Sequence, residues 1–148
     1  MKHSNPAKDY LSQAYRIDQR INSKLEQVAS LRALATKATG AIQENPVSHT
    51  RDVHSLESTI AKIVDLEKEI NADIDSLVDT KCEIVGVIKA VASSEYQTLL
   101  EMRYLCFKTW EQIAVALDHD VRWVYSLHDK ALAQAAKIIS GGQQEKSL

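Results

Sequence analysis

The chain has 148 residues, which suits one domain, or a small domain with an extended element. Its net charge of −2 gives no overall basic field that would mark a nucleic-acid binder. No apolar run is long enough to cross a membrane, and the first residues lack the hydrophobic segment of an export signal. We therefore expect a soluble, cytoplasmic protein. Because the only prolines are Pro6 and Pro46, nearly all of the chain is free to form helix.

The first segment has the pattern of a long amphipathic helix. From about residue 7 to 38, apolar residues such as Leu11, Ile17 and Ile21 recur every three or four positions. Gly40 is expected to end this helix, and "GAIQENPVSHT" is expected to form a polar connector.

The second segment, about residues 52–92, has the heptad pattern of a coiled coil. Two polar residues, Glu67 and Lys81, occupy positions of the register. Two long helices joined by a short connector predict an antiparallel hairpin over residues 1–92. The apolar register positions are Val53, Leu56, Ile60, Ile63, Ile70, Ile74, Leu77, Ile84, Ile88 and Val91.

The charge distribution favours the same pairing. Residues 1–43 contain seven basic and three acidic residues, whereas residues 65–83 contain seven acidic and two basic ones. Because exposed ion pairs contribute little energy, this pattern argues for orientation rather than stability. An antiparallel hairpin would place Arg16, Arg20 and Lys24 near Asp73, Asp75 and Asp79.

The third segment, residues 93–140, predicts three further helices. Ser94 with Gln97, and Thr109 with Gln112, have the spacing of capping boxes. Asp120 is expected to cap a last helix that runs to about residue 139, followed by a flexible tail over 141–148. Nothing in the chain alternates as a strand does, so the predicted fold class is all-α.

No constellation for catalysis is present in the sequence. It contains no HExxH, P-loop, GxGxxG or GxSxG motif, and its histidines and cysteines lack the spacing of zinc ligands. We therefore expect no enzymatic activity, no cofactor and no metal site. Cys82 and Cys106 are expected to be small core residues, and His128 a surface residue.

The stretch "TWEQIAVALDHDVRWVYSLHDKAL" meets the steric requirements of a helix-turn-helix. Apolar residues are spaced so that both helices share a small core, and Ala114 allows their close crossing. These core residues are Ile113, Leu117, Val124 and Leu127. The residues predicted to point outward from the second helix are Val121, Arg122, Tyr125, Ser126 and Asp129.

Residues 94–138, which include "LLEMRYLCFKTWEQIAVALDHDVRWVYSLHDKALAQ", resemble region 4 of the sigma-70 class of bacterial transcription initiation factors. A helical hairpin followed by this module is similar to small sigma-like regulators of phages and prophages of Gram-positive bacteria. The resemblance implies a transcriptional regulator in the cytoplasm of a bacterial host, with double-stranded DNA as its partner.

The resemblance also implies contact residues. Val121, Arg122 and Ser126 would approach bases, with Tyr125 and Lys130 toward the backbone. Lys108 and Thr109 would contact phosphate at the start of the preceding helix. The sequence departs from the family pattern at Asp118, where glycine is usual, at His119, where an apolar residue is usual, and at Val121, which is often arginine.

Charge limits the strength of DNA binding by this module. Residues 94–140 contain five basic and six acidic residues, so few phosphates would be neutralised. Binding would be weak alone, and would need a homodimer formed through the hairpin, or RNA polymerase or another protein. Two alternatives remain: a packaging protein like a terminase small subunit, and a protein-binding adaptor with a degenerate helix-turn-helix.

Overall fold

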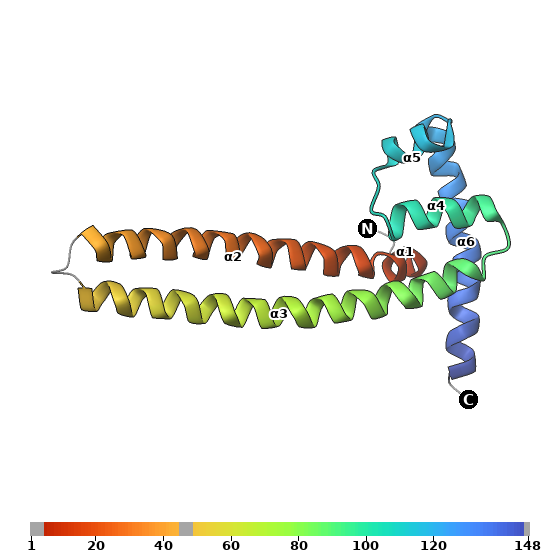
Figure 1. Cartoon of the computed structure of the whole chain (residues 1–148). Helices are drawn as coiled ribbons and strands as arrows, with labels where there is room; N and C mark the ends of the chain where they lie inside the picture. Colours follow the sequence, from red (N-terminus) through yellow and green to blue (C-terminus); the bar gives the residue numbers. More distant parts are fainter. Residues whose placement is uncertain (1–4, 45–48, 147–148) are drawn as a thin grey trace. The chain divides into compact units, whose positions relative to one another are not determined.

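The computed structural model describes residues 5–44 and 49–146, with side chains over 5–40 and 53–142. All regular structure in these ranges is helical (Figure 1), so the fold class is all-α, as predicted. No helix in these ranges has both the length and the hydropathy needed to span a membrane. The helices are α1 (Pro6–Leu11), α2 (Gln13–Glu44), α3 (His49–Lys89), α4 (Ser94–Tyr104), α5 (Trp110–Leu117) and α6 (Val121–Lys146).

Glycines do not end helices where the sequence predicted that they would. α2 continues through Gly40 to Glu44, and α6 continues through the expected start of the tail at 141 to Lys146. A glycine costs a helix only about 1 kcal/mol relative to alanine, which the neighbouring residues can offset. Of the expected connector, residues 45–48 lie outside the described ranges.

Two other helix starts differ from the predicted ones. The first helix is divided at Ser12, whose N–H donates to the Lys8 carbonyl at 2.9 Å and closes α1. The N-cap of α4 is Ser93 and not Ser94, because its hydroxyl accepts from the Tyr96 N–H. The predicted capping box at Ser94 is therefore wrong: the Gln97 amide instead donates to the Val91 carbonyl at 2.6 Å.

Contacts divide the chain into two compact units. The first, which we call the hairpin unit, contains residues 17–76; the second, the core unit, contains the residues up to Arg16 and from Leu77 onward. The sequence pattern placed a boundary at residue 92, whereas the end of α3 and all of α1 belong with α4, α5 and α6.

In the hairpin unit α2 and α3 run side by side in opposite directions (Figure 1), as ion pairs between them confirm. Of the ten apolar positions in the predicted register of α3, eight are buried or half-buried and two are exposed. One row of the seam, Leu56, Ile63 and Ile70, is at least half-buried, but Ile60 is 48% and Ile74 42% exposed. The other row consists of Thr59, Leu66 and Asp73.

The reason is that α3 is apolar on both sides of the Leu56/Ile63/Ile70 row. Leu66 lies on one side of that row, and Ile60 and Ile74 lie on the other. A single partner helix covers a stripe roughly 100° wide, so it can bury only one side.

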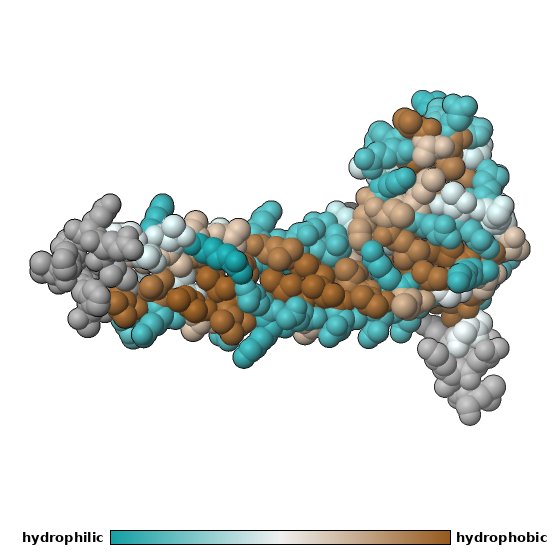
Figure 2. Space-filling view, in the orientation of Figure 1, coloured by the Kyte–Doolittle hydropathy of each residue, from teal (hydrophilic) through white to brown (hydrophobic). Residues whose placement is uncertain are grey.

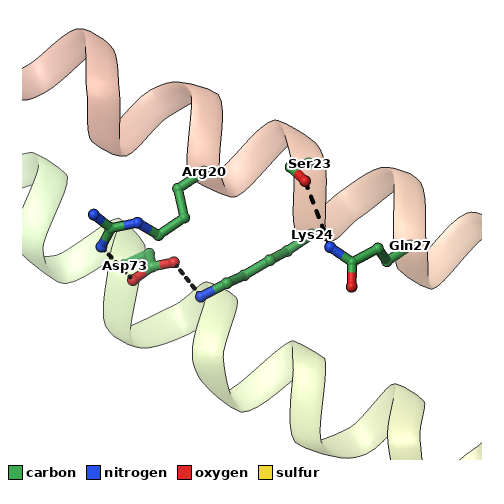
Figure 3. A network of polar contacts seen from close by, with 5 residues as sticks. All are labelled: Arg20, Ser23, Lys24, Gln27 and Asp73. Atoms are coloured by element: carbon green, nitrogen blue, oxygen red, sulfur yellow. Dashed lines mark hydrogen bonds and ion pairs between the residues drawn. The ribbon is translucent and has the colours of Figure 1, made fainter.

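Lys24 and Asp73 form a half-buried ion pair inside the seam. Lys24 Nζ lies 2.7 Å from Asp73 Oδ2, with side chains 19% and 14% exposed, and Arg20 lies 3.8 Å from the other oxygen (Figure 3). Two of the three predicted basic residues therefore pair with Asp73. The third, Arg16, instead donates to the Asp9 carbonyl at 2.9 Å.

The core unit is organised around α6, against which α1, α4 and α5 pack. Most of its core is apolar, with Leu11, Ile84, Leu99, Leu100 and Ile113 fully buried. The expectation that Cys82 and Cys106 are core residues is wrong, since both are exposed. Cys82 belongs to the outer side of α3, and Cys106 to the short loop after α4, where no second layer covers them.

Candidate nucleic-acid interface

Local hydrogen bonds fix the chain between α4 and α6. Thr109 Oγ1 accepts from the Gln112 N–H at 3.2 Å, and Gln112 Oε1 accepts from the Thr109 N–H at 2.9 Å. This reciprocal capping box was predicted. Asp118 ends α5 in the left-handed conformation at φ 57°, which aspartate tolerates better than most residues. Asp120 Oδ1 then accepts from the Trp123 N–H at 2.8 Å and caps α6, also as predicted.

The residues predicted to form the small core between α5 and α6 are buried or half-buried. Ile113 and Val124 are fully buried, while Ala114 and Leu127 are at most 8% exposed. Leu117 is half-buried at the edge. Because these contacts are tight, α5 and the first turns of α6 hold a fixed angle.

Four of the five residues predicted to contact DNA from α6 lie on its outer face. Arg122, Ser126 and Lys130 are exposed, and Tyr125 is 45% exposed with its ring edge against Trp110, at a centroid distance of 5.3 Å. The fifth, Val121, was predicted to point outward, but this is wrong: its apolar side chain is half-buried against the core. The four exposed side chains can therefore reach a ligand, but Asp129 is exposed on the same face and opposes an anion.

Thr109 and Lys108, the two residues predicted to contact phosphate, lie at the start of α5. Thr109 is exposed at the start of α5, but its backbone N–H is already used by the capping box. Among the described residues no ion pair is formed by the half-buried Lys108. Glu111, in the first turn, weakens the attraction of this helix end for an anion.

A buried polar cluster behind this face was not predicted. His128, expected at the surface, is only 5% exposed, and its Nε2 forms a hydrogen bond with the Tyr104 hydroxyl of α4. Its ring also lies 4.6 Å from the Trp110 ring. Tyr104 lies 24 residues earlier in the chain, so no local sequence pattern predicts that it pairs with His128.

Burial decides the ionisation of this cluster. Desolvation lowers the pKa of His128 to about 4; Asp129 opposes this shift, and Lys8 and Arg103 add to it. Desolvation likewise raises the pKa of the Tyr104 hydroxyl. At neutral pH the neutral imidazole and the neutral phenol therefore hold α4 to α6 by a hydrogen bond without a buried charge.

The turn between α5 and α6 carries a second, acidic surface. An open hollow there is lined by Glu111, Asp118 and Asp120 together with Val115, which is 83% exposed. His119 and Trp123 stack beside the turn with ring centroids 3.5 Å apart. This surface repels phosphate and presents an apolar side chain to solvent.

In comparisons with known proteins, no family model matches the chain, and neither a curated protein nor a solved structure matches it.

Proposed function

We propose that the chain is a DNA-binding transcriptional regulator of phage or prophage type, with a sigma region 4-like helix-turn-helix at α5 and α6. The observation that carries the proposal is the outer face of α6, where Arg122, Tyr125, Ser126 and Lys130 are exposed on a helix with a rigid, capped start. A helix held in this way suits insertion into the major groove, with its first turns at base edges.

The charge of the module requires a second contribution to affinity. Asp118, Asp120 and Asp129 lie on or beside the reading face, so one copy would neutralise only a few phosphates. We propose that the hairpin unit supplies this contribution by dimerisation, which doubles the number of recognition helices.

One side of the hairpin unit carries exposed apolar side chains among the described residues. Ile60, Glu67 and Ile74 follow one another at heptad spacing on α3, as Leu25 and Arg32 do on α2. Arg32 Nη2 lies 2.7 Å from Glu67 Oε1, so the two rows share one side of the hairpin. Apolar residues gather along the hairpin in Figure 2. On this side Leu25 is 49%, Ile60 48% and Ile74 42% exposed.

This side is suited to a second copy of the chain. A two-fold axis along the hairpin would set α2 of one copy over α3 of the other, so that Arg32 meets Glu67 of the second copy and Leu25 meets Ile74. A face about 40 Å long and about 20 Å wide offers roughly the 800 Å² per partner that a standard interface buries. A two-fold arrangement would therefore bring apolar side chains together and pair opposite charges across the interface.

A protein-binding adaptor is the second candidate, and one observation favours it. Val115 is 83% exposed beside Glu111, Asp118 and Asp120, a combination suited to a basic, partly apolar protein surface rather than to DNA. On this account α5 and not α6 would be the contact element.

Equilibrium binding to a duplex across a salt series distinguishes the two candidates. We expect measurable binding at about 50 mM salt that weakens steeply by about 200 mM. Arg122→Ala should weaken it by about 1 kcal/mol or more, whereas Lys137→Ala, the same charge change at an exposed position of α6 beyond the reading face, should not. Absence of binding to random and to native upstream DNA at the lower salt would reject DNA readout and favour the adaptor.

A further inference from the structure

A small hollow in the core unit has cationic and hydroxyl groups in its wall. It lies between the first two helices and the α4–α5 loop and has a volume of about 190 Å³. A water molecule occupies roughly 30 Å³ of liquid, so the hollow has room for a tetrahedral oxyanion with some water. Its wall includes Lys8, Ser12 and Tyr15 on one side and Arg103, Phe107 and Thr109 on the other.

The two sides of the hollow are brought together by the fold. Lys8, Ser12 and Tyr15 are spaced by four and three residues, so they share one face of the first two helices. Phe107 adopts a positive φ of 57°, and its ring meets the Tyr15 ring edge-on at a centroid distance of 5.6 Å. This contact closes one end of the hollow with aromatic side chains.

Arg103 is held in place before any ligand arrives. One guanidinium nitrogen donates to the Lys108 carbonyl at 2.9 Å, and the guanidinium lies 4.2 Å from the centre of the Trp110 ring. These contacts leave its other N–H donors free for an acceptor. A fixed guanidinium loses less conformational entropy on binding an oxyanion than a mobile one does.

The charged residues in the wall of this hollow are both cations. Its wall contains no carboxylate, and the ion pairs within the described ranges involve neither Lys8 nor Arg103. Both cations act on His128, whose pKa they help to lower while Asp129 opposes them, so Lys8 and Arg103 belong to the same region of the core unit. Lys81 adds a third positive charge above the Phe107 ring, at 4.9 Å.

We propose that this hollow is a phosphate-binding site, in which Lys8 and Arg103 bind the anion and the hydroxyls of Ser12, Tyr15 and Thr109 donate to its oxygens. The phosphate is either a DNA backbone phosphodiester or a free phosphorylated small molecule. The site supplies cations that a charge count over residues 94–140 omits, because Lys8 comes from the other end of the chain. It stands independently of the function proposed for α6.

Titration of the full-length, isotope-labelled protein with inorganic phosphate, at constant ionic strength, tests the site. We expect the amide resonances of Ser12, Tyr15 and Thr109 to shift and saturate. Lys8→Ala should weaken phosphate binding about tenfold, the effect of losing a charge-assisted contact. Lys8 is exposed, so this variant should fold normally, and Lys137→Ala serves as the matched control. No saturable shift, or equal affinity in the Lys8→Ala protein, would refute the site.

A second arm identifies the source of the phosphate. If it belongs to DNA, Lys8→Ala should also weaken duplex binding and reduce the salt slope by about one. If Lys8→Ala loses inorganic phosphate but binds duplex like the wild type, the ligand is a free phosphorylated molecule. Failure of duplex binding in every protein would reject the proposed function and leave the phosphate titration to decide the site by itself.

Discussion

At the scale of single residues, the sites that fix the α5–α6 turn are local and were predictable, whereas the groups that join α4 to α6 were not. Thr109 and Asp120 cap helices that begin within three residues of them, so spacing alone identifies them. His128 depends on Tyr104, which belongs to another helix. A buried imidazole of this kind is recognised only once the packing of α4 on α6 is known.

His128 should make the core unit sensitive to acid. Its pKa is 6.5 in an unfolded chain and about 4 in the fold, so between these values the unfolded state binds more protons. Stability from this group is complete above pH 6.5 and is lost as the pH falls toward 4, by up to roughly 3 kcal/mol. Urea unfolding across this range should show the loss.

The matched variant for this prediction is His128→Gln, which cannot titrate. Carboxylates contribute to acid unfolding in both proteins, so the difference between the two pH profiles isolates the imidazole. Between pH 6.5 and 5 the wild type should lose stability faster than the variant. Parallel profiles would contradict the buried, neutral His128.

At the scale of the helices, the sequence predicted the hairpin and its direction, but its register was wrong at Ile60 and Ile74. Leu56, Ile63 and Ile70 belong to the seam in the predicted register and in the observed one. They lie between Ile60 and Ile74 on one side and Leu66 on the other, so α2 covers them in either case. The choice between Leu66 and Ile60 depends on which side α2 covers, and Lys24 of α2 pairs with Asp73 on the covered side. Heptad spacing within one helix does not contain this information.

The Lys24–Asp73 pair should specify the register more than it stabilises the hairpin. Asp73→Leu leaves Lys24 half-buried without a partner and should cost about 1–3 kcal/mol. Replacing both residues by Lys24→Met and Asp73→Leu should restore most of that loss, since apolar residues often replace a buried ion pair without cost. Unfolding free energies of the four proteins in a double-mutant cycle test this. An additive loss in the double variant would show that the pair contributes no coupling.

At the scale of the whole molecule, the all-helical class and the absence of strands in the described ranges followed from periodicity alone. The grouping of α1 with α6 did not, because these contacts join the two ends of the sequence. A charge count over the helix-turn-helix segment therefore leaves out Lys8, which belongs to α1 but contributes to the electrostatics at His128.

The apolar side of the hairpin unit should determine the oligomeric state. The wild type should be a dimer by light scattering at micromolar concentration, and Ile60→Glu with Ile74→Glu should make it monomeric without loss of helix content. Leu34→Glu is the control, since Leu34 is 54% exposed but lies outside the Ile60 and Ile74 row. A monomeric wild type, or a dimer that persists in the double variant, would contradict this interface. A ring-sized assembly would favour the packaging-subunit alternative.

The central claim is that the outer face of α6 contacts duplex DNA, and the most direct measurement is a map of backbone amide shifts on adding a duplex at about 50 mM salt. We predict that the largest shifts fall on Arg122, Tyr125, Ser126 and Lys130, with smaller ones at Lys108 and Thr109. Shifts confined to Val115 and Asp118, or no shifts at all, would contradict the claim.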